Sequence, residues 1–185
     1  MAGSRRVPND PERKARILDA TLATIAEHGV HATTHRRIAA EAGVPLGSLT
    51  YYFDGIDAIF EQAFARLAEE MSSRYEAALT GARDQAEACD VVTEVICGGD
   101  YVSQRELVLL WELYAYANHN EAVARLTRDW LQRSRASLAR HFSPAACVAI
   151  DALVEAWPMH QSFQQSPLDR DAVRATIAAI ARELG

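Results

Sequence analysis

The sequence predicts an all-α protein of about nine helices in two domains. Apolar residues recur at helical spacing almost throughout, and no segment shows the alternation that is typical of a strand. Of the 185 residues, 49% are hydrophobic, which is enough to bury a sizeable core. We place a disordered basic arm at 1–9, a first domain at 10–55 and a second domain at 56–185.

The first domain begins with a helix whose start and stop signals are both present. Asp10 is suited to the N-cap and Pro11 to the first helical position, and Gly29 follows the last periodic residue. Thr34 is suited to cap the next helix. The apolar face of the first helix is formed by Ile17, Leu18, Leu22 and Ile25.

The stretch 33–53 predicts two short helices joined by a tight turn. The first is apolar on one face through Ile38 and Ala42, and Gly43 ends it. The second begins near Pro45. This is the layout of a helix-turn-helix, whose second helix lies in the major groove of DNA. Together with the first helix, it makes a three-helix DNA-binding domain.

The second domain is predicted to contain six helices. Asp54 and Asp57 open a long helix that stops near Gly81, and we expect Phe60 and Phe64 on it to pack back on the first domain. Pro158 is expected to kink the helix in which it lies. The other helices are indicated by a periodic segment over roughly 84–97, the Ser103–Glu106 capping box, Asn120, Ser143 before Pro144, and Asp169.

Charge is divided unevenly between the two domains, although the whole chain has a net charge of −6. Residues 1–55 contain seven Lys/Arg and six Asp/Glu, a net of +1, whereas residues 56–185 contain twelve and nineteen, a net of −7. This asymmetry is typical of a DNA-reading head on a body that does not touch DNA. The basic residues of the head are Arg5, Arg6, Arg13, Lys14, Arg16, Arg36 and Arg37.

The composition indicates neither a membrane span nor a secretory signal. No apolar run approaches ~20 residues, and the N-terminus has basic residues without an apolar segment behind them. We therefore expect a cytoplasmic protein. Cys89, Cys97 and Cys147 are widely spaced, and we expect them to be buried apolar residues. A redox sensor would instead need an exposed thiol of lowered pKa, and no basic residue adjoins any of the three in sequence.

With these elements in place, residues 10–60 resemble the N-terminal domain of TetR-type bacterial repressors. The resemblance rests on the first helix ending at Gly29, Thr33-Thr34, Ile38-Ala39, Ala42-Gly43-Val44, Gly47-Ser48-Leu49, Tyr51-Tyr52-Phe53 and the apolar helix that follows. The rest of the chain agrees with this family only in architecture. The resemblance implies a homodimer whose last two helices form a four-helix interface. It also implies a ligand cavity in the second domain and release of DNA when ligand binds.

The motif departs from the family pattern at two positions. Thr50 stands where the family usually has tyrosine, and Ile56 stands where it usually has a lysine that contacts phosphate. Asp54 nearby adds negative charge. We therefore expect DNA affinity to depend more on the arginines of the motif, on Tyr51 and on the N-terminal arm.

The candidate DNA contacts all lie in the helix-turn-helix. Arginines at a helix N-terminus suit phosphate, Leu46 suits a thymine methyl group, and Gly47 allows close approach of the backbone. By the resemblance, Tyr51 and Tyr52 contact phosphates or bases. Arg5 and Arg6 either enter a minor groove or form a loose basic tail. The candidates are Thr34, His35, Arg36, Arg37, Pro45, Leu46, Gly47, Ser48, Thr50, Tyr51 and Tyr52.

Aromatic and polar residues of the second domain indicate an apolar or aromatic ligand pocket with a few polar anchors. The alternative for each one singly is ordinary helical core. The candidates for effector binding are Trp111, Glu112, Tyr114, Asn118, Trp130, Trp157, His160 and Phe163. Apolar stripes on the last two helices indicate a dimer bundle, with monomer core as the alternative. Its candidates are Ile150, Leu153, Val154, Trp157, Val173, Ile177, Ile180 and Leu184.

We therefore expect a ligand-responsive transcriptional repressor that binds a palindromic operator in double-stranded DNA as a homodimer. A small, largely apolar or aromatic effector would release it. The alternative is a DNA-binding regulator controlled by cysteine oxidation or by a protein partner. A helical enzyme is disfavoured because the chain has no GxSxG, P-loop or GxGxxG motif, and we expect no cofactor and no metal because no Cys/His cluster has zinc spacing.

Overall fold

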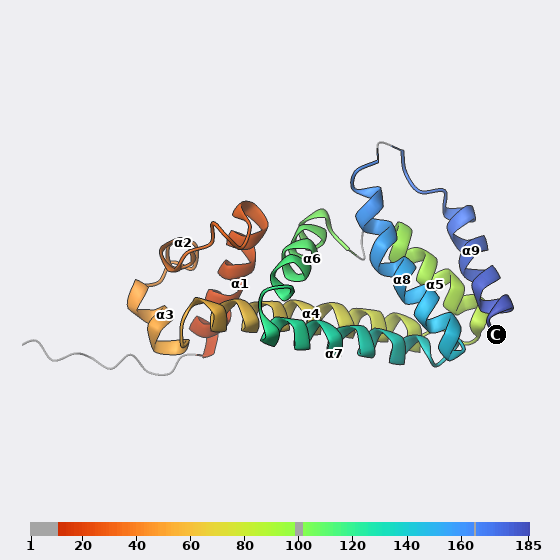
Figure 1. Ribbon diagram of the computed structural model, residues 1–185, viewed down its shortest axis with the longest axis horizontal. Helices are drawn as coiled ribbons and strands as arrows, with labels where there is room; N and C mark the ends of the chain where they lie inside the picture. Colours follow the sequence, from red (N-terminus) through yellow and green to blue (C-terminus); the bar gives the residue numbers. More distant parts are fainter. Residues whose placement is uncertain (1–10, 99–101, 165) are drawn as a thin grey trace, which may run out of the picture. The chain divides into compact units, whose positions relative to one another are not determined.

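The computed structural model describes residues 11–98, 102–164 and 166–185, and its regular structure there is helical (Figure 1). The predicted all-α class and the number of helices are confirmed within these residues. The arm at 1–9 and the Asp10 cap lie outside them. The helices are α1 (Pro11–His28), α2 (His35–Glu41), α3 (Leu46–Tyr52), α4 (Ile56–Thr80), α5 (Gln85–Cys97), α6 (Gln104–Ala117), α7 (Glu121–Leu138), α8 (Pro144–Gln161) and α9 (Arg170–Glu183).

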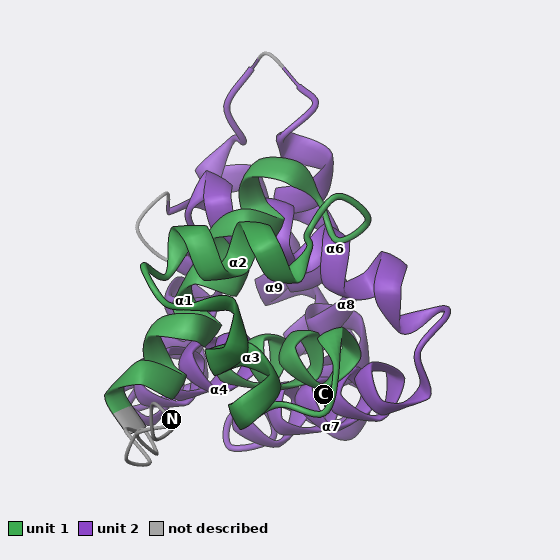
Figure 2. Cartoon of the chain, turned by 90° about the vertical axis from the view of Figure 1, so that its left-hand side faces the viewer, with its two compact units in different colours: residues 1–66 green, residues 67–185 purple. Residues whose placement is uncertain are grey.

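The chain divides into two compact units, residues 1–66 and 67–185, which Figure 2 shows in different colours. The division falls inside α4 rather than before it. The first turns of α4 belong to unit 1 because their apolar side chains complete its core, as predicted for Phe60 and Phe64, which are 3% and 0% exposed. Arg66 also pairs with Asp19 of α1, with Nη2 3.0 Å from Oδ1.

Helix ends follow the local signals in the sequence. Gly29 and Gly43 have φ values of 76° and 62°, the left-handed conformation in which glycine ends a helix without strain. The side chain of Thr34 accepts a hydrogen bond from the Arg37 backbone N–H at 3.3 Å. The predicted caps are also formed at Ser103 with its capping box, Asn120, Ser143 and Asp169. Asp84, which caps α5, is an additional one.

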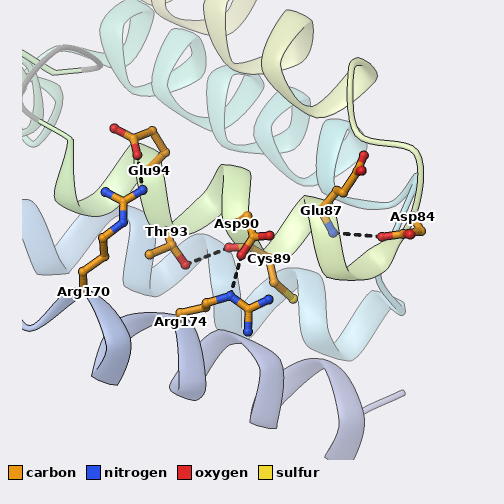
Figure 3. A network of polar contacts seen from close by, with 8 residues as sticks. All are labelled: Asp84, Glu87, Cys89, Asp90, Thr93, Glu94, Arg170 and Arg174. Carbon is orange, nitrogen blue, oxygen red and sulfur yellow. Dashed lines mark hydrogen bonds and ion pairs between the residues drawn. The ribbon is translucent and has the colours of Figure 1, made fainter.

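The core of unit 2 lies mainly among α5, α8 and α9, which contact one another. Ser143 Oγ, at the start of α8, donates to the Leu184 carbonyl at the end of α9, so the two helices run antiparallel. Two ion pairs join α5 to α9 on the outside: Arg170 with Glu94, and Arg174 Nε with Asp90 Oδ1 at 2.5 Å (Figure 3). Within the described residues, no helix is both long enough and apolar enough to cross a membrane.

Candidate nucleic-acid interface and ligand cavity

The helix-turn-helix of unit 1 separates a buried face from an exposed one. Ile38 and Leu49 are fully buried, and Phe53 is 4% exposed. Leu49 and Phe53 therefore belong to the core of unit 1. The buried side chains hold α2 and α3 together from inside, so the residues between them in each helical turn are turned outward.

The outward face of α3 presents four of the candidate DNA contacts together. Leu46 and Tyr51 are 46% and 58% exposed, and Gly47 and Thr50 are exposed as well. Because residues four apart lie on one side of a helix, the pairs 46/50 and 47/51 form one continuous strip. A Cβ atom added at Gly47 would meet nothing within 4 Å, so this strip is unobstructed there. We call these four residues the reading strip.

The two tyrosines of α3 have different surroundings. Tyr51 is exposed, whereas Tyr52 is half-buried and lies beside Phe53, with ring centroids 6.4 Å apart. The two tyrosine rings meet edge to face at 4.9 Å. Tyr51 is therefore the tyrosine presented to a ligand of the strip, and Tyr52 supports it from the side.

The arginines of α2 differ in their contacts. Arg37 Nη1 donates to the Ala32 carbonyl at 2.9 Å, which fixes its side chain against the preceding turn. Arg36 is exposed and forms no ion pair within the part of the chain that the structure describes. Thr34, Pro45 and the arginines are exposed, and His35 and Ser48 are half-buried. The eleven candidates thus lie on one short stretch, with Arg36 the most available cation among them.

Around the position of the missing lysine, the structure shows which cation is present. Ile56, the first residue of α4, is half-buried and carries no charge. Lys14 of α1 lies over the ring of Phe53, the residue after α3, with its Nζ 5.5 Å from the ring centroid. Sequence reasoning placed Lys14 only in a general basic cluster, because a contact between α1 and the residue after α3 has no local signal.

Unit 2 contains a cavity of about 210 Å³ whose wall is drawn from α4, α5, α6, α7 and α8. The α4 side of the wall consists of Glu69, Met71, Ser72, Ser73, Tyr75 and Glu76. The apolar part of the wall includes Val95, Leu107, Leu110, Trp130 and Val154. Such a cavity, mostly apolar with a few polar groups, is suited to a small organic ligand.

Most of the predicted effector residues lie away from this cavity. Trp130 lines it, and Tyr114 reaches it indirectly through its neighbours. The structure does not place Trp111, Glu112, Asn118, Trp157, His160 or Phe163 on its wall. Trp111 and Phe163 contact each other instead, with ring centroids 4.6 Å apart. An aromatic residue type predicts that the side chain is buried, but not which neighbouring helix or cavity it faces. This is why these residues were wrongly assigned to the ligand cavity.

Sequence reasoning missed Glu155, the acidic residue that α8 contributes to the wall. The Tyr114 hydroxyl donates a hydrogen bond to its carboxylate. Burial raises the pKa of Glu155 to about 7, an effect opposed by this hydrogen bond and increased by the charge of Asp151. Burial likewise raises the pKa of Tyr114. A signal was available: Asp151 and Glu155 are the acidic residues of an otherwise apolar helix, four apart and therefore on one face.

Comparison with known proteins settles the family. The model of the bacterial regulatory proteins of the tetR family matches residues 17–63, which span the helix-turn-helix and the start of α4. The chain belongs to the TetR family of transcriptional regulators. It is a DNA-binding regulator, and its relatives are regulators rather than enzymes.

Similarity to individual TetR-family and regulator proteins extends over nearly the whole chain. SCO7518 of Streptomyces coelicolor A3(2), named as a transcriptional regulator, is 40% identical; the match covers 92% of this chain and 99% of that one, with a TM-score of 0.84. The multidrug binding protein EbrR in complex with malachite green is 30% identical over 92% and 99% of the two chains, with a TM-score of 0.74. The regulator BetI of Escherichia coli O157:H7 is 25% identical over 85% and 86%.

The predicted dimer residues fall into two groups in this TetR-family chain. Ile150, Val173 and Ile177 are 0%, 1% and 0% exposed within the single chain, so they are core residues of unit 2 and cannot meet a partner. Their assignment to the dimer interface was therefore wrong. The helical spacing of apolar residues shows that one side of a helix is buried, but not whether the same chain or a partner buries it. The remaining candidates are half-buried or exposed: Leu153, Val154, Trp157, Ile180 and Leu184.

The cysteines are poorly suited to redox sensing. Cys89 and Cys147 are buried, and burial raises the pKa of all three thiols. The sequence showed no adjacent basic residue, but the fold places Arg174 near Cys89 (Figure 3). Arg170 lies near Cys97, and each arginine opposes the rise in its thiol's pKa without overcoming it. Among the described residues, no group of three or more His, Cys, Asp or Glu side chains could hold a metal ion.

Proposed function

We propose that this TetR-family regulator is a repressor that binds a palindromic operator as a homodimer and is released by a small molecule in the cavity of unit 2. The observation that carries the proposal is the course of α4. Its later turns supply Met71, Ser72 and Tyr75 to the cavity wall, and its first turns supply Ile59 and Phe64 to the core of unit 1. A ligand that displaces the later turns of α4 therefore acts on the same helix whose first turns belong to the core of unit 1.

The outer faces of α8 and α9 support a homodimer. Positions exposed on α8 recur at three- and four-residue intervals, and on α9 two exposed alanines and one half-buried alanine have the same spacing. Their side chains are small and apolar, and Val148 is 52% exposed. Small residues let helices approach closely, so the two faces suit packing against a second copy in a four-helix bundle. They are Ala145, Val148, Ala152 and Ala156 on α8, and Ala172, Ala175 and Ala179 on α9.

The relatives support a small-molecule effector. EbrR is a multidrug binding protein seen in complexes with imidazole, ethidium, malachite green and proflavin, and its fold covers more than nine-tenths of this chain. The cavity of about 210 Å³ is smaller than the roughly 300–1,000 Å³ of sites for drug-sized ligands. The effector is thus a small molecule, or the cavity widens as it binds.

DNA binding is tested first by selecting high-affinity sites from a random-sequence duplex pool and measuring fluorescence anisotropy on the selected site, a scrambled site and a salt series. We expect a palindrome whose half-sites lie about 34–36 Å apart. Tyr51→Ala should weaken binding to the selected site, whereas Phe163→Ala, which removes an exposed aromatic ring from unit 2, should not. Equal affinity for selected and scrambled DNA at every salt concentration would refute sequence-specific operator binding.

Ligand response and dimerisation have separate tests. By linkage, an effector that weakens DNA binding by a given factor must itself be weakened by operator DNA by the same factor. Val148→Glu places a charge on the outer face of α8 and should give a monomer by light scattering, with operator affinity lost. A Val148→Glu protein that remains dimeric would contradict the proposed interface.

A further inference from the structure

Glu155 is a largely buried carboxylate with no cationic partner. Its single hydrogen bond comes from the neutral hydroxyl of Tyr114, and among the described residues no lysine, arginine or histidine pairs with it. An unpaired charge of this kind is costly, because a low-dielectric interior does not replace the water that the ion loses. Because burial disfavours the charged form, it raises the pKa of Glu155.

The other charges at the cavity wall are already matched. Glu69 pairs with Arg133 Nη1 at 2.5 Å, and Glu76 pairs with Arg140 Nη2 at 3.0 Å. With Glu155, the wall contains three carboxylates against two guanidinium groups, so the balance is one negative charge. Both arginines are engaged, which leaves no basic group to attract an anionic ligand.

Asp151, one turn before Glu155, is a buried carboxylate that does have a cationic partner. Its Oδ2 accepts from Arg135 Nε at 2.8 Å and its Oδ1 from Ser134 Oγ at 2.6 Å. Arg135 therefore balances Asp151 and is not available to Glu155. The two acidic residues of α8 thus differ: one is satisfied by the protein, and the other faces a cavity.

The rest of the wall suits an apolar or aromatic body with a positive charge. Trp130, which is 6% exposed, lines the cavity, and Tyr114 stacks on it with ring centroids 6.2 Å apart. Aromatic faces attract organic cations through their negative quadrupole. Ser72 Oγ, on the α4 side, is buried and makes no hydrogen bond within the described residues. It provides a second polar group on the wall, from a different helix than Glu155 and Trp130.

We infer that the cavity of unit 2 binds a small organic molecule with a single positive charge and an apolar or aromatic body, and that Glu155 is its counter-ion. This inference rests on the proposed ligand response, and it specifies the ligand's charge. A bound cation would balance the charge of the Glu155 carboxylate, whereas a neutral ligand would cover that carboxylate and leave its charge uncompensated. The charged or titratable groups around Glu155 are Tyr114, Asp151, Arg133, Arg135, Arg140, Glu69 and Glu76.

The test compares two probes of equal shape: phenyltrimethylammonium, which is permanently charged, and its uncharged carbon isostere tert-butylbenzene. Binding to the full chain is measured by calorimetry and by tryptophan fluorescence. We expect the wild type to bind the cation at least tenfold more tightly than the isostere. Glu155→Gln should abolish this preference while leaving affinity for the isostere within about twofold, and Glu121→Gln, an exposed change on α7, should leave both affinities unchanged.

A second measurement needs no variant. Because the probe's charge is fixed, its affinity for the wild type should follow the ionised fraction of Glu155 and rise about tenfold from pH 6 to pH 8. Equal affinity for both probes, failure of the cation to bind, or an unchanged cation affinity in Glu155→Gln would overturn the inference. Addition of operator DNA separates this result from the proposed function. A cation that binds through Glu155 without weakening operator binding refutes only the ligand response, and a neutral ligand that releases DNA refutes only the charge assignment.

Discussion

The arginines of unit 1's DNA-binding motif and those of unit 2 make different contacts. In unit 2, arginines reach carboxylates on other helices, as Arg133 does with Glu69, Arg135 with Asp151, Arg140 with Glu76, Arg170 with Glu94 and Arg174 with Asp90. In the motif, Arg37 donates to a backbone carbonyl, and Arg36 forms no ion pair within the described residues. The body uses arginine to join helices, and the motif leaves it available to phosphate.

This difference explains how an acidic protein can bind DNA. Unit 2 holds eleven of the nineteen Lys/Arg residues, yet ten of these arginines pair with a carboxylate and offer little charge to an external polyanion. Whether a basic residue is paired thus matters more for DNA binding than how many there are. The ion pairs of unit 2 also differ in how deeply the carboxylate is buried. The side chain of Asp151 is 2% exposed, whereas those of Asp90 and Glu94 are 56% and 55% exposed.

The largest effect is expected from Arg135→Ala. This change leaves the Asp151 carboxylate buried with only the Ser134 hydroxyl beside it, and loss of one partner of a buried pair costs about 3 kcal/mol of stability. Urea unfolding at fixed protein concentration measures it. Arg133→Ala on the same helix removes a pair with the exposed Glu69 and should cost less than about 1 kcal/mol. Equal losses in the two variants would show that depth does not distinguish these pairs.

The features that sequence predicted well depend on neighbouring residues. Thr34, Asn120 and Asp169 cap helices because each can bond a backbone N–H two or three residues ahead, whatever surrounds the helix. Gly29 and Gly43 end helices through their own backbone freedom. The reading strip follows for the same reason, since Leu49 within α3 and Phe53 at its C-cap face inward and fix which side of the helix is exposed.

The sequence predicted an apolar ligand cavity in the second domain, but not which residues form its wall. Its wall combines α4, α5, α6, α7 and α8, and the rotation of each helix about its axis decides which residues meet there. Trp157 and Trp130 look alike in sequence, but Trp130 lines the cavity and Trp157 packs against the core of unit 2. The prediction that Ile150 and Ile177 lie in a dimer interface was wrong for the same reason, because α5 packs against α8 and α9 and both residues are buried in the single chain.

Glu155→Gln should change the pH dependence of stability. The folded protein raises the pKa of Glu155 from 4.5 to about 7, so the folded state holds this proton more tightly than the unfolded state. Stability contributed by the protonated group is therefore lost as pH rises from about 4.5 to about 7, and the loss is complete above that range. Between pH 5 and pH 8, the variant should gain on the order of 2 kcal/mol relative to wild type.

Urea unfolding of both proteins at the two pH values checks this prediction. Glu69→Gln, which neutralises an exposed carboxylate of the same cavity wall, controls for the loss of a charge as such. If the difference between Glu155→Gln and wild type is the same at pH 5 and pH 8, then Glu155 does not titrate in this range.

Arg36→Ala tests the unpaired side of the comparison. A phosphate contact by Arg36 should supply about 1–2 kcal/mol of operator affinity and nothing to folding, since the side chain is exposed and unpaired in the described structure. Its loss should weaken selected and scrambled DNA alike and lower the slope of log affinity against log salt by about 1. Arg125→Ala, with the same charge change on α7, should alter neither value. Loss of affinity for the selected site alone would instead assign Arg36 to a base edge.

The smallest effect is expected from Arg174→Ala on the outside of unit 2. Arg174 and Asp90 have side chains 47% and 56% exposed, so water and salt screen their attraction, and the loss should be no more than about 0.5 kcal/mol. Urea unfolding in low salt and in 1 M salt measures it, and the difference from wild type should shrink in high salt. Cys89 gives a second measurement of the same change. Arg174 opposes the raised pKa of this thiol, so Arg174→Ala should raise that pKa further and slow the reaction of Cys89 with a thiol reagent. A stability loss comparable to that of Arg135→Ala would mean that α9 is held by its ion pairs. A small loss would leave the buried Val173 and Ile177 as the contacts that hold α9.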